Sequence, residues 1–278
     1  MGLPVVIGRN GLDFEILGPA LVAGLLVLAT HVPLGLIVLR RGIIFIDIAL
    51  AQVAALGVVF GVYVWGELGT FAIQASAVTA AIGCAGFFVW TDKRFPNQQE
   101  ALIGVTYVFT AALQLILLAS NPSGAEHLKD LLVGQILWVT PLKLVQLAAL
   151  YAPIVVLMTI VDLSRQRMLF YTIFAICITI SVQIVGLFLV FSTLIIPALA
   201  ARVGPERYQH MLAFNIGAAG YVAGLLISGA FDIPTGAAIV CTLVPTAVVA
   251  AVLIRLCWSR TAEQVELHGS NHAAHPAE

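Results

Sequence analysis

The stretch RRGIIFIDIALAQVAALG, residues 40–57, places two arginines before a long apolar run that contains one carboxylate, Asp47, and one amide, Gln52. The run continues to residue 65, so it has the ~20 apolar residues that a helix needs to cross a bilayer. Paired arginines at its start are typical of the cytoplasmic end of a span. Because an ionisable group inside a span is costly, Asp47 requires either an ion-pair partner or a function.

The composition indicates that the whole chain is a membrane protein. Of its 278 residues, 61% are hydrophobic and only 10% are charged, whereas soluble domains have about 25% charged residues. The formal net charge of -1 gives no basic surface for nucleic acid, so we expect no nucleic-acid partner. The sequence has no phosphate-binding loop, nucleophile elbow or strong zinc-hydrolase motif, and we therefore expect that the chain is not an enzyme.

Nine apolar runs predict an all-α, polytopic transmembrane helical bundle. They cover residues 16–39, 43–65, 69–90, 101–119, 142–161, 169–187, 189–201, 210–231 and 234–257. The seventh run is short and contains Pro197, so it is either a half helix or a continuation of its neighbour, which makes eight or nine spans. We expect residues 1–260 to form a single transmembrane domain. Residues 261–278 are predicted to form a flexible cytoplasmic tail whose histidines either bind a metal weakly or are incidental.

Lysine and arginine are concentrated in alternate connections, which predicts the orientation of the chain. The intervening turns, residues 65–69 and 231–236, are poor in positive charge. With nine spans, the N-terminus lies outside and the C-terminus is cytoplasmic. The basic residues that mark the cytoplasmic ends are Arg40, Arg41, Lys93, Arg94, Arg165, Arg167, Arg202, Arg207, Arg255 and Arg260.

The residue types leave two explanations open for each polar group in the second span. Asp47 is either a helix-start aspartate or partner of Arg40 or Arg41, or an oxygen ligand for a cation in a transport path. Gln52 is either a second oxygen ligand or an interhelical hydrogen-bond partner. Positions 47 and 52 lie about 140° apart on a regular α-helix, whereas Asp47 and Ala51 share a face. Interhelical hydrogen bonding is also expected for the other amides in spans, Gln74, Gln114, Gln183 and Asn215.

Four parts of the sequence resemble the permease subunits of bacterial ABC importers for zinc, manganese and iron. PLGLIVLRRGIIFIDIALAQVAALG (33–57) is similar to the family's junction of the first and second spans, and EALIGVTYVFTAALQLILLAS (100–120) is similar to its fourth span. LLVGQILWVTPLKL (131–144) resembles the outer helix that follows. VGLFLVFSTLIIPALAARV (185–203) and FDIPTGAAIV (231–240) resemble its late spans.

The resemblance implies a complex in which two permeases form the path, cytoplasmic ATPase subunits drive it, and an outer solute-binding protein delivers the metal. We therefore expect a lipid-embedded homodimer in the bacterial inner membrane. It would hold no permanent cofactor and would move a divalent metal ion, zinc or manganese. The alternatives are an ion-coupled secondary carrier and a non-transporting membrane subunit that docks a metal-delivery protein.

The resemblance also implies candidate ligands for the ion. In the family an aspartate in the second span, with a histidine four residues later, is implicated in passing the ion, and Asp47 matches that aspartate. Position 51 is Ala51, and Gln52 takes the place of the histidine if one residue is inserted. A π-bulge between 47 and 52 would bring Gln52 onto the face of Asp47.

His31 is the nearest nitrogen ligand by sequence, or else a satisfied interior histidine. Candidates for an outer vestibule, or else parts of a solvated loop, are Glu126, His127 and Asp130.

One departure from the family concerns coupling to an ATPase. The stretch VDLSRQRMLFY, residues 161–171, is shorter than the family's cytoplasmic coupling element between the fifth and sixth spans. Either the ATPase docks elsewhere, for example on RVGPERYQH (202–210), or coupling differs.

Overall fold

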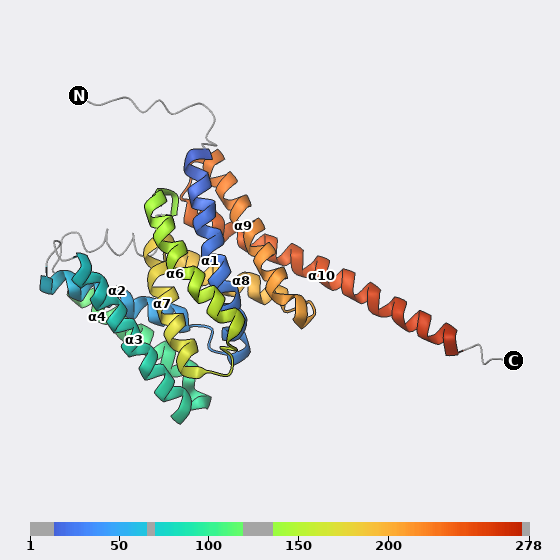
Figure 1. Ribbon diagram of the computed structural model, residues 1–278, viewed down its shortest axis with the longest axis horizontal. Helices are drawn as coiled ribbons and strands as arrows, with labels where there is room; N and C mark the ends of the chain where they lie inside the picture. The colour runs from blue at the N-terminus through green and yellow to red at the C-terminus, as the bar shows by residue number, and fades with distance from the viewer. Residues whose placement is uncertain (1–13, 66–69, 119–135, 274–278) are drawn as a thin grey trace.

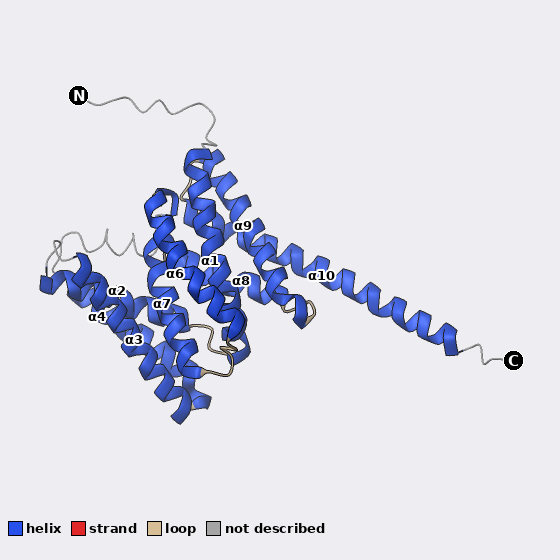
Figure 2. Ribbon diagram, viewed as in Figure 1, coloured by secondary structure: helices blue, strands red, loops and turns tan. Residues whose placement is uncertain are grey.

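A computed structural model describes residues 14–65, 70–118 and 136–273, and side chains only as far as Trp258. Within these ranges every regular element is a helix, which confirms the all-α prediction (Figures 1 and 2). The long helices are α1 (Phe14–Arg41), α2 (Ile46–Trp65), α3 (Thr70–Arg94), α4 (Gln99–Leu118), α6 (Pro141–Ile160), α7 (Arg167–Val185), α8 (Leu187–Ala201), α9 (Gln209–Phe231) and α10 (Thr235–Ala273). Single 3₁₀ turns lie at η1 (Pro96–Gln98), η2 (Ile136–Trp138) and η3 (Glu206–Tyr208).

Eight of these helices are long and apolar enough to cross a membrane, and α8 is the exception. With 15 residues, α8 is about 22 Å long, which is less than the ~30 Å of a bilayer core. It is separated from α7 by Gly186, whose φ of 84° favours glycine. The flanking Val185 and Leu187 are buried, so the irregular turn is surrounded by protein, as non-helical backbone at membrane depth requires. The seventh run is therefore a short helix of its own.

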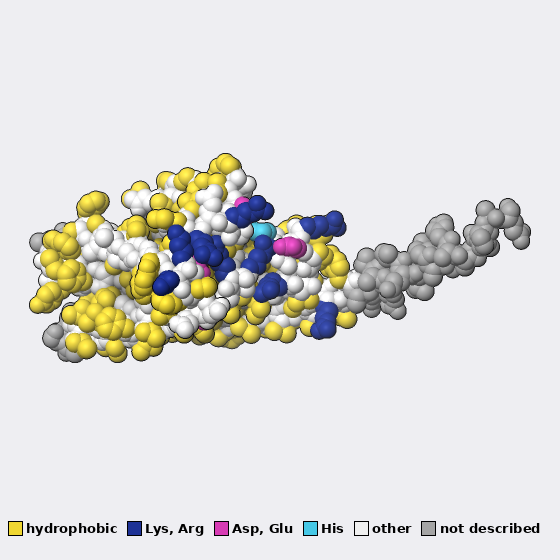
Figure 3. All heavy atoms as spheres, turned by 90° about the horizontal axis from the view of Figure 1, so that it is seen from below, with side chains coloured by type: hydrophobic (Ala, Val, Ile, Leu, Met, Phe, Trp, Pro, Cys, Tyr) yellow, Lys and Arg dark blue, Asp and Glu magenta, His cyan; other side chains and the backbone are white. Residues whose placement is uncertain are grey.

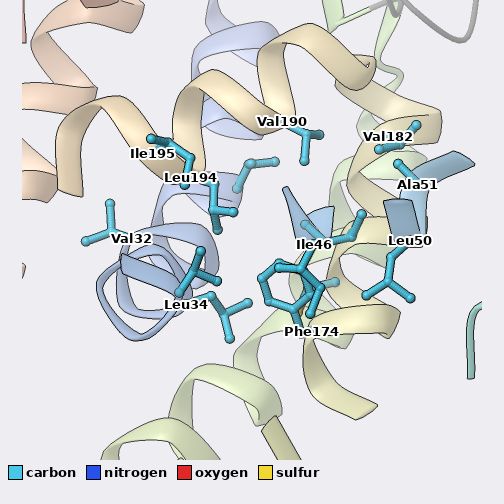
Figure 4. Close-up of a cluster of buried hydrophobic side chains, with 14 of the residues drawn as sticks. Val32, Leu34, Ile46, Leu50, Ala51, Phe174, Val182, Val190, Leu194 and Ile195 are labelled. Atoms are coloured by element: carbon cyan, nitrogen blue, oxygen red, sulfur yellow. The ribbon is translucent and has the colours of Figure 1, made fainter. Parts of the chain in front are cut away.

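The helices pack in two groups that α7 joins. One group contains α2, α3 and α4, and the other contains α1, α6, α8, α9 and α10 (Figure 1). At the junction, Ile46 and Leu50 of α2 belong to one buried cluster with Phe174 of α7 and Leu194 of α8 (Figure 4). Apolar packing therefore surrounds the first turns of α2, where Asp47 lies.

The pairing of α9 with α10 depends on small residues. A Cβ atom on Gly224 would lie 2.4 Å from the Cα atom of Ile239, and one on Gly220 would lie 2.5 Å from Cδ2 of Leu243. At Gly224 the contact is with backbone, so a larger residue requires the helices to move apart, whereas at Gly220 the end of the Leu243 side chain would have to shift. The glycines thus mediate close packing within the subunit.

The connections that carry arginine lie together at one end of the bundle. Figure 3 shows Lys and Arg side chains gathered on one face of the molecule. Arginines tie the end of α1 to two connections that are distant in sequence: Arg40 pairs with Glu206 at 3.2 Å, Arg41 Nη2 donates to the Ser164 carbonyl at 2.9 Å, and Arg202 donates to the Leu39 carbonyl at 3.4 Å.

Helix α10 continues well beyond the apolar part of its sequence. It runs to Ala273 and extends away from the other helices (Figure 1). Most of the segment that was expected to be a tail is therefore helical, while its flexibility and the role of its histidines stay predictions. The side chains of His268 and His272, and all of His275, lie outside the described part of the chain.

Candidate functional site

Asp47 is a fully buried carboxylate in the first turn of α2. The backbone amides of Asp47 and Ile48 lie near it, as expected at a helix start, where the dipole favours negative charge. Neither carboxylate oxygen, however, has a hydrogen-bond partner of normal geometry. Buried polar atoms are rarely left in this state, so both oxygens are available to a ligand.

The arginines that precede Asp47 are used elsewhere. Arg40 pairs with Glu206, and Arg41 donates to backbone carbonyls and lies 4.5 Å from the ring centroid of Phe170. The ion-pair explanation for Asp47 is therefore wrong. Among the described side chains, no lysine or arginine forms a salt bridge with Asp47.

Glu100, which the sequence interpretation missed, is a second carboxylate at the same end of α2. It lies in the first turn of α4, and its Oε1 atom accepts a hydrogen bond from the Phe45 backbone amide at 3.2 Å. Its Oε2 atom is buried without a partner. The Phe45 amide lies two residues before Asp47, so the two carboxylates lie at the same end of α2. Glu100 opens the EALIG segment, and an acidic residue at the start of an apolar span was the signal that could have found it.

Gln52 faces away from Asp47 and toward α4. Helix α2 is α-helical from Ile46 to Trp65, so the predicted π-bulge is wrong. Gln52 Nε2 donates to Oε1 of Gln114, and both side chains are buried. The interhelical explanation is confirmed for this pair, while a role of Gln52 as a metal ligand stays a prediction. Asn215, by contrast, donates to the Met211 carbonyl of its own helix, so the interhelical expectation is wrong there.

His31 is fully buried in α1 and only half satisfied. Its Nδ1 atom lies 2.9 Å from the Val27 carbonyl oxygen and 2.9 Å from the Thr30 hydroxyl, and its Nε2 atom has no partner. In the tautomer whose Nδ1–H donates to Val27, Nε2 carries a lone pair that can bind a metal.

The predicted ligands do not assemble into one cluster. Within the described ranges, no hydrogen bond joins Asp47, Gln52 and His31, and no three His, Cys, Asp or Glu side chains come together. A resident metal centre of three or more such ligands is therefore absent from the described part of the chain. The vestibule candidates Glu126, His127 and Asp130 lie outside it.

These features belong to a chain that matches a family model over most of its length. Residues 13–173 and 160–254 match the model of the ABC 3 transport family. The chain belongs to the ABC 3 transport family. It is thus a multi-pass membrane permease of an ABC transporter, as the resemblance implied.

Relatives of this permease agree with that assignment. It is 23% identical to ZnuB of Haemophilus influenzae, a high-affinity zinc uptake system membrane protein, over 82% of this chain and 93% of that one. It is 26% identical to MntB of Synechocystis, a manganese transport system membrane protein, over 63% of this chain and 64% of that one. PsaBC from Streptococcus pneumoniae, solved with a Fab, shares the fold with a TM-score of 0.61 at 20% identity, over 86% of this chain and 91% of that one.

The two matched segments overlap at 160–173, around the connection that the sequence predicted to be short. In the permease this connection, residues 161–166, is a turn between α6 and α7 with no helix of its own. The Ser164 side chain and amide donate to Asp162, and Arg165 pairs with the same carboxylate at 3.1 Å. The Ser164 hydroxyl is the main cause that lowers the pKa of Asp162, so the turn keeps its charge at neutral pH.

Proposed function

We propose that this permease imports a divalent metal ion, zinc or manganese, across the bacterial inner membrane, and that the ion contacts Asp47 on its way. The supporting observation is that Asp47 is fully buried in a membrane helix with two unpartnered oxygens. A charge in this position needs a counter-charge, and a passing cation supplies it. The class of ion follows the relatives described as zinc and manganese transport membrane proteins.

The partners follow from the family. A separate cytoplasmic ATPase supplies the energy, an outer solute-binding protein delivers the ion, and a second copy of the permease completes the path. The C-terminus is cytoplasmic, a proposal that the gathering of the basic connections at one end supports (Figure 3). Large apolar side chains exposed on α4 and α6, such as Phe109 and Val145, then face lipid or the second copy.

The ATPase contact is proposed to lie on residues 202–210. The 161–166 turn offers no helix, whereas η3 is an ordered turn that Arg40 holds through Glu206. The same short turn favours the second candidate function, an ion-coupled secondary carrier in which Asp47 relays the cation. The third candidate, a docking subunit that does not transport, rests on residues outside the described ranges.

The choice between zinc and manganese depends on which side chains join Asp47. His31 would add the nitrogen that zinc prefers. Carboxylate and amide oxygens alone suit manganese better. Because the Nε2 atom of His31 is unpartnered, zinc remains a candidate for the transported ion.

The proposed function is tested with the permease purified together with its ATPase and reconstituted in vesicles. Uptake of radioactive zinc and manganese is measured with and without ATP for the wild type, Asp47→Asn and Asp232→Asn. Asp232 is a suitable control because it occupies a left-handed turn, φ 51°, that asparagine also adopts. We expect ATP-dependent uptake that Asp47→Asn abolishes and Asp232→Asn retains. Uptake that depends on an ion gradient and does not require ATP would instead support the ion-coupled secondary carrier.

A further inference from the structure

We propose that Glu100 is a second cation-binding carboxylate, which receives the metal ion from Asp47 and releases it toward the basic end of the bundle. This inference rests on the proposed function, since it adds an exit step to the path through Asp47. It also narrows the choice between zinc and manganese, because both carboxylates offer only oxygen ligands.

The first support is the set of unpartnered carboxylate oxygens. Both oxygens of Asp47 and the Oε2 atom of Glu100 are buried and have no hydrogen-bond partner. The two charges repel each other, and the described residues form no salt bridge with either. Two carboxylates at the same end of α2 without a counter-charge are unfavourable in an apolar surrounding. A divalent cation near them removes that cost and provides the missing partner for the free oxygens.

The second support is the order of the two groups along the membrane. Asp47 is fully buried, whereas Glu100 is partly exposed. The Glu100 carboxylate accepts a hydrogen bond from the backbone amide of Phe45. Phe45 lies two residues before Asp47 in the chain, on the side of Arg40 and Arg41. Glu100 therefore lies between Asp47 and the end of the bundle where the arginines gather, as an exit ligand requires.

The donor set also indicates the kind of ion that leaves by this route. Asp47 and Glu100 are hard oxygen ligands, which suit manganese(II). Zinc is bound preferentially where nitrogen or sulfur is present. We therefore infer that the pair favours manganese over zinc at the exit step.

A purely structural role for Glu100 must be separated from ion binding. A carboxylate near the start of α2 stabilises the helix dipole and satisfies the Phe45 amide. Glu100→Gln keeps an acceptor oxygen at the same distance but removes the charge, whereas Glu100→Ala removes both. Glu100→Gln also weakens the dipole interaction, which would lower the unfolding temperature, whereas a loss of manganese binding at an unchanged unfolding temperature reports ion binding alone.

The experiment uses the permease–ATPase complex in vesicles and compares wild type, Glu100→Gln, Glu100→Asp, Glu100→Ala and the control Asp232→Asn. Asp232 is a suitable control because it is an exposed carboxylate at the end of α9, outside both the proposed ion path and the proposed ATPase contact. Radioactive manganese uptake, manganese binding by EPR and thermal unfolding are measured for each. We expect Glu100→Gln to unfold like the wild type but to lose about tenfold or more in manganese uptake and binding. Glu100→Asp should recover part of both, and Asp232→Asn should change neither.

Two results would overturn the inference while leaving the proposed function intact. In the first, wild type and Glu100→Gln take up and bind manganese equally. In the second, only Glu100→Ala is impaired and it unfolds earlier, which would mean that Glu100 merely caps α2. If the wild type itself takes up no metal with ATP, the proposed function fails, and that outcome is distinct from both.

Discussion

The side chains of Gln52 in α2 and Gln114 in α4 are hydrogen-bonded to each other inside the apolar bundle. Because α2 is a regular helix, the face that carries Gln52 is turned about 140° from the face that carries Asp47. The amide therefore joins two helices, while the carboxylate lies at another surface of the same helix. The two polar residues in one short stretch thus have separate environments.

Removing one member of this amide pair should destabilise the permease, because it leaves a buried amide without a partner. We expect Gln52→Leu and Gln114→Leu each to cost about 1 kcal/mol and to lower the unfolding temperature in detergent. The double variant should be less destabilised than the sum of the two. Gln74→Leu is the matched control, since Gln74 is exposed. Strict additivity of the two single changes would contradict the pairing.

Placing a histidine at two adjacent positions should distinguish the face of Asp47 from that of Gln52. Ala51→His puts an imidazole one turn from Asp47, and we expect zinc uptake to rise relative to manganese uptake. Gln52→His puts it against Gln114 and should leave the metal preference unchanged. The measurement is uptake of both metals from an equimolar mixture. A shift toward zinc only in Gln52→His would show that the face assignment is wrong.

Alanine at Gly224 should separate α9 from α10. The added Cβ atom would meet the backbone of Ile239 at 2.4 Å, and relief requires the helices to shift, at a cost of about 1–3 kcal/mol. Gly104→Ala is the control, because nothing lies within 4 Å of its Cβ position. It should be neutral or stabilising, since alanine is the better helix former. Thermal unfolding of the purified permease checks both, and equal effects would contradict the close packing.

A charge reversal should show which connection contacts the ATPase. If the ATPase docks on residues 202–210, Glu206→Arg should reduce its copurification severalfold, and Arg165→Glu should have little effect. Both side chains are exposed, and surface ion pairs contribute at most about 1 kcal/mol, so the fold should be retained in each. The opposite pattern would place the contact on the 161–166 turn.

Much of the fold could be predicted from the positions of charged residues and from the apolar runs of the sequence. The paired arginines at 40–41, the apolar run after them and the turn at 231–236 locate helix ends, because a bilayer demands about 20 apolar residues and favours positive charge on one side. The helices α2 and α9 begin and end within a few residues of these predictions, and α10 begins where predicted but ends at Ala273, well beyond the predicted residue 257. The shortness of the connection within residues 161–171 could also be predicted from the sequence, and residues 161–166 form a turn ahead of α7.

Tertiary structure decided what each polar residue touches. The sequence by itself determined that Asp47 is a charge within a membrane helix, and that Gln52 is an amide one residue out of step with the family's histidine. Only the packed helices decided that Arg40 binds Glu206, that Gln52 meets Gln114 and that Glu100 accepts from the Phe45 amide, two residues before Asp47. The physical reason is that bilayer insertion depends on the local sequence of one span. The partner of a buried polar group depends instead on which distant helix presents a side chain at the same depth.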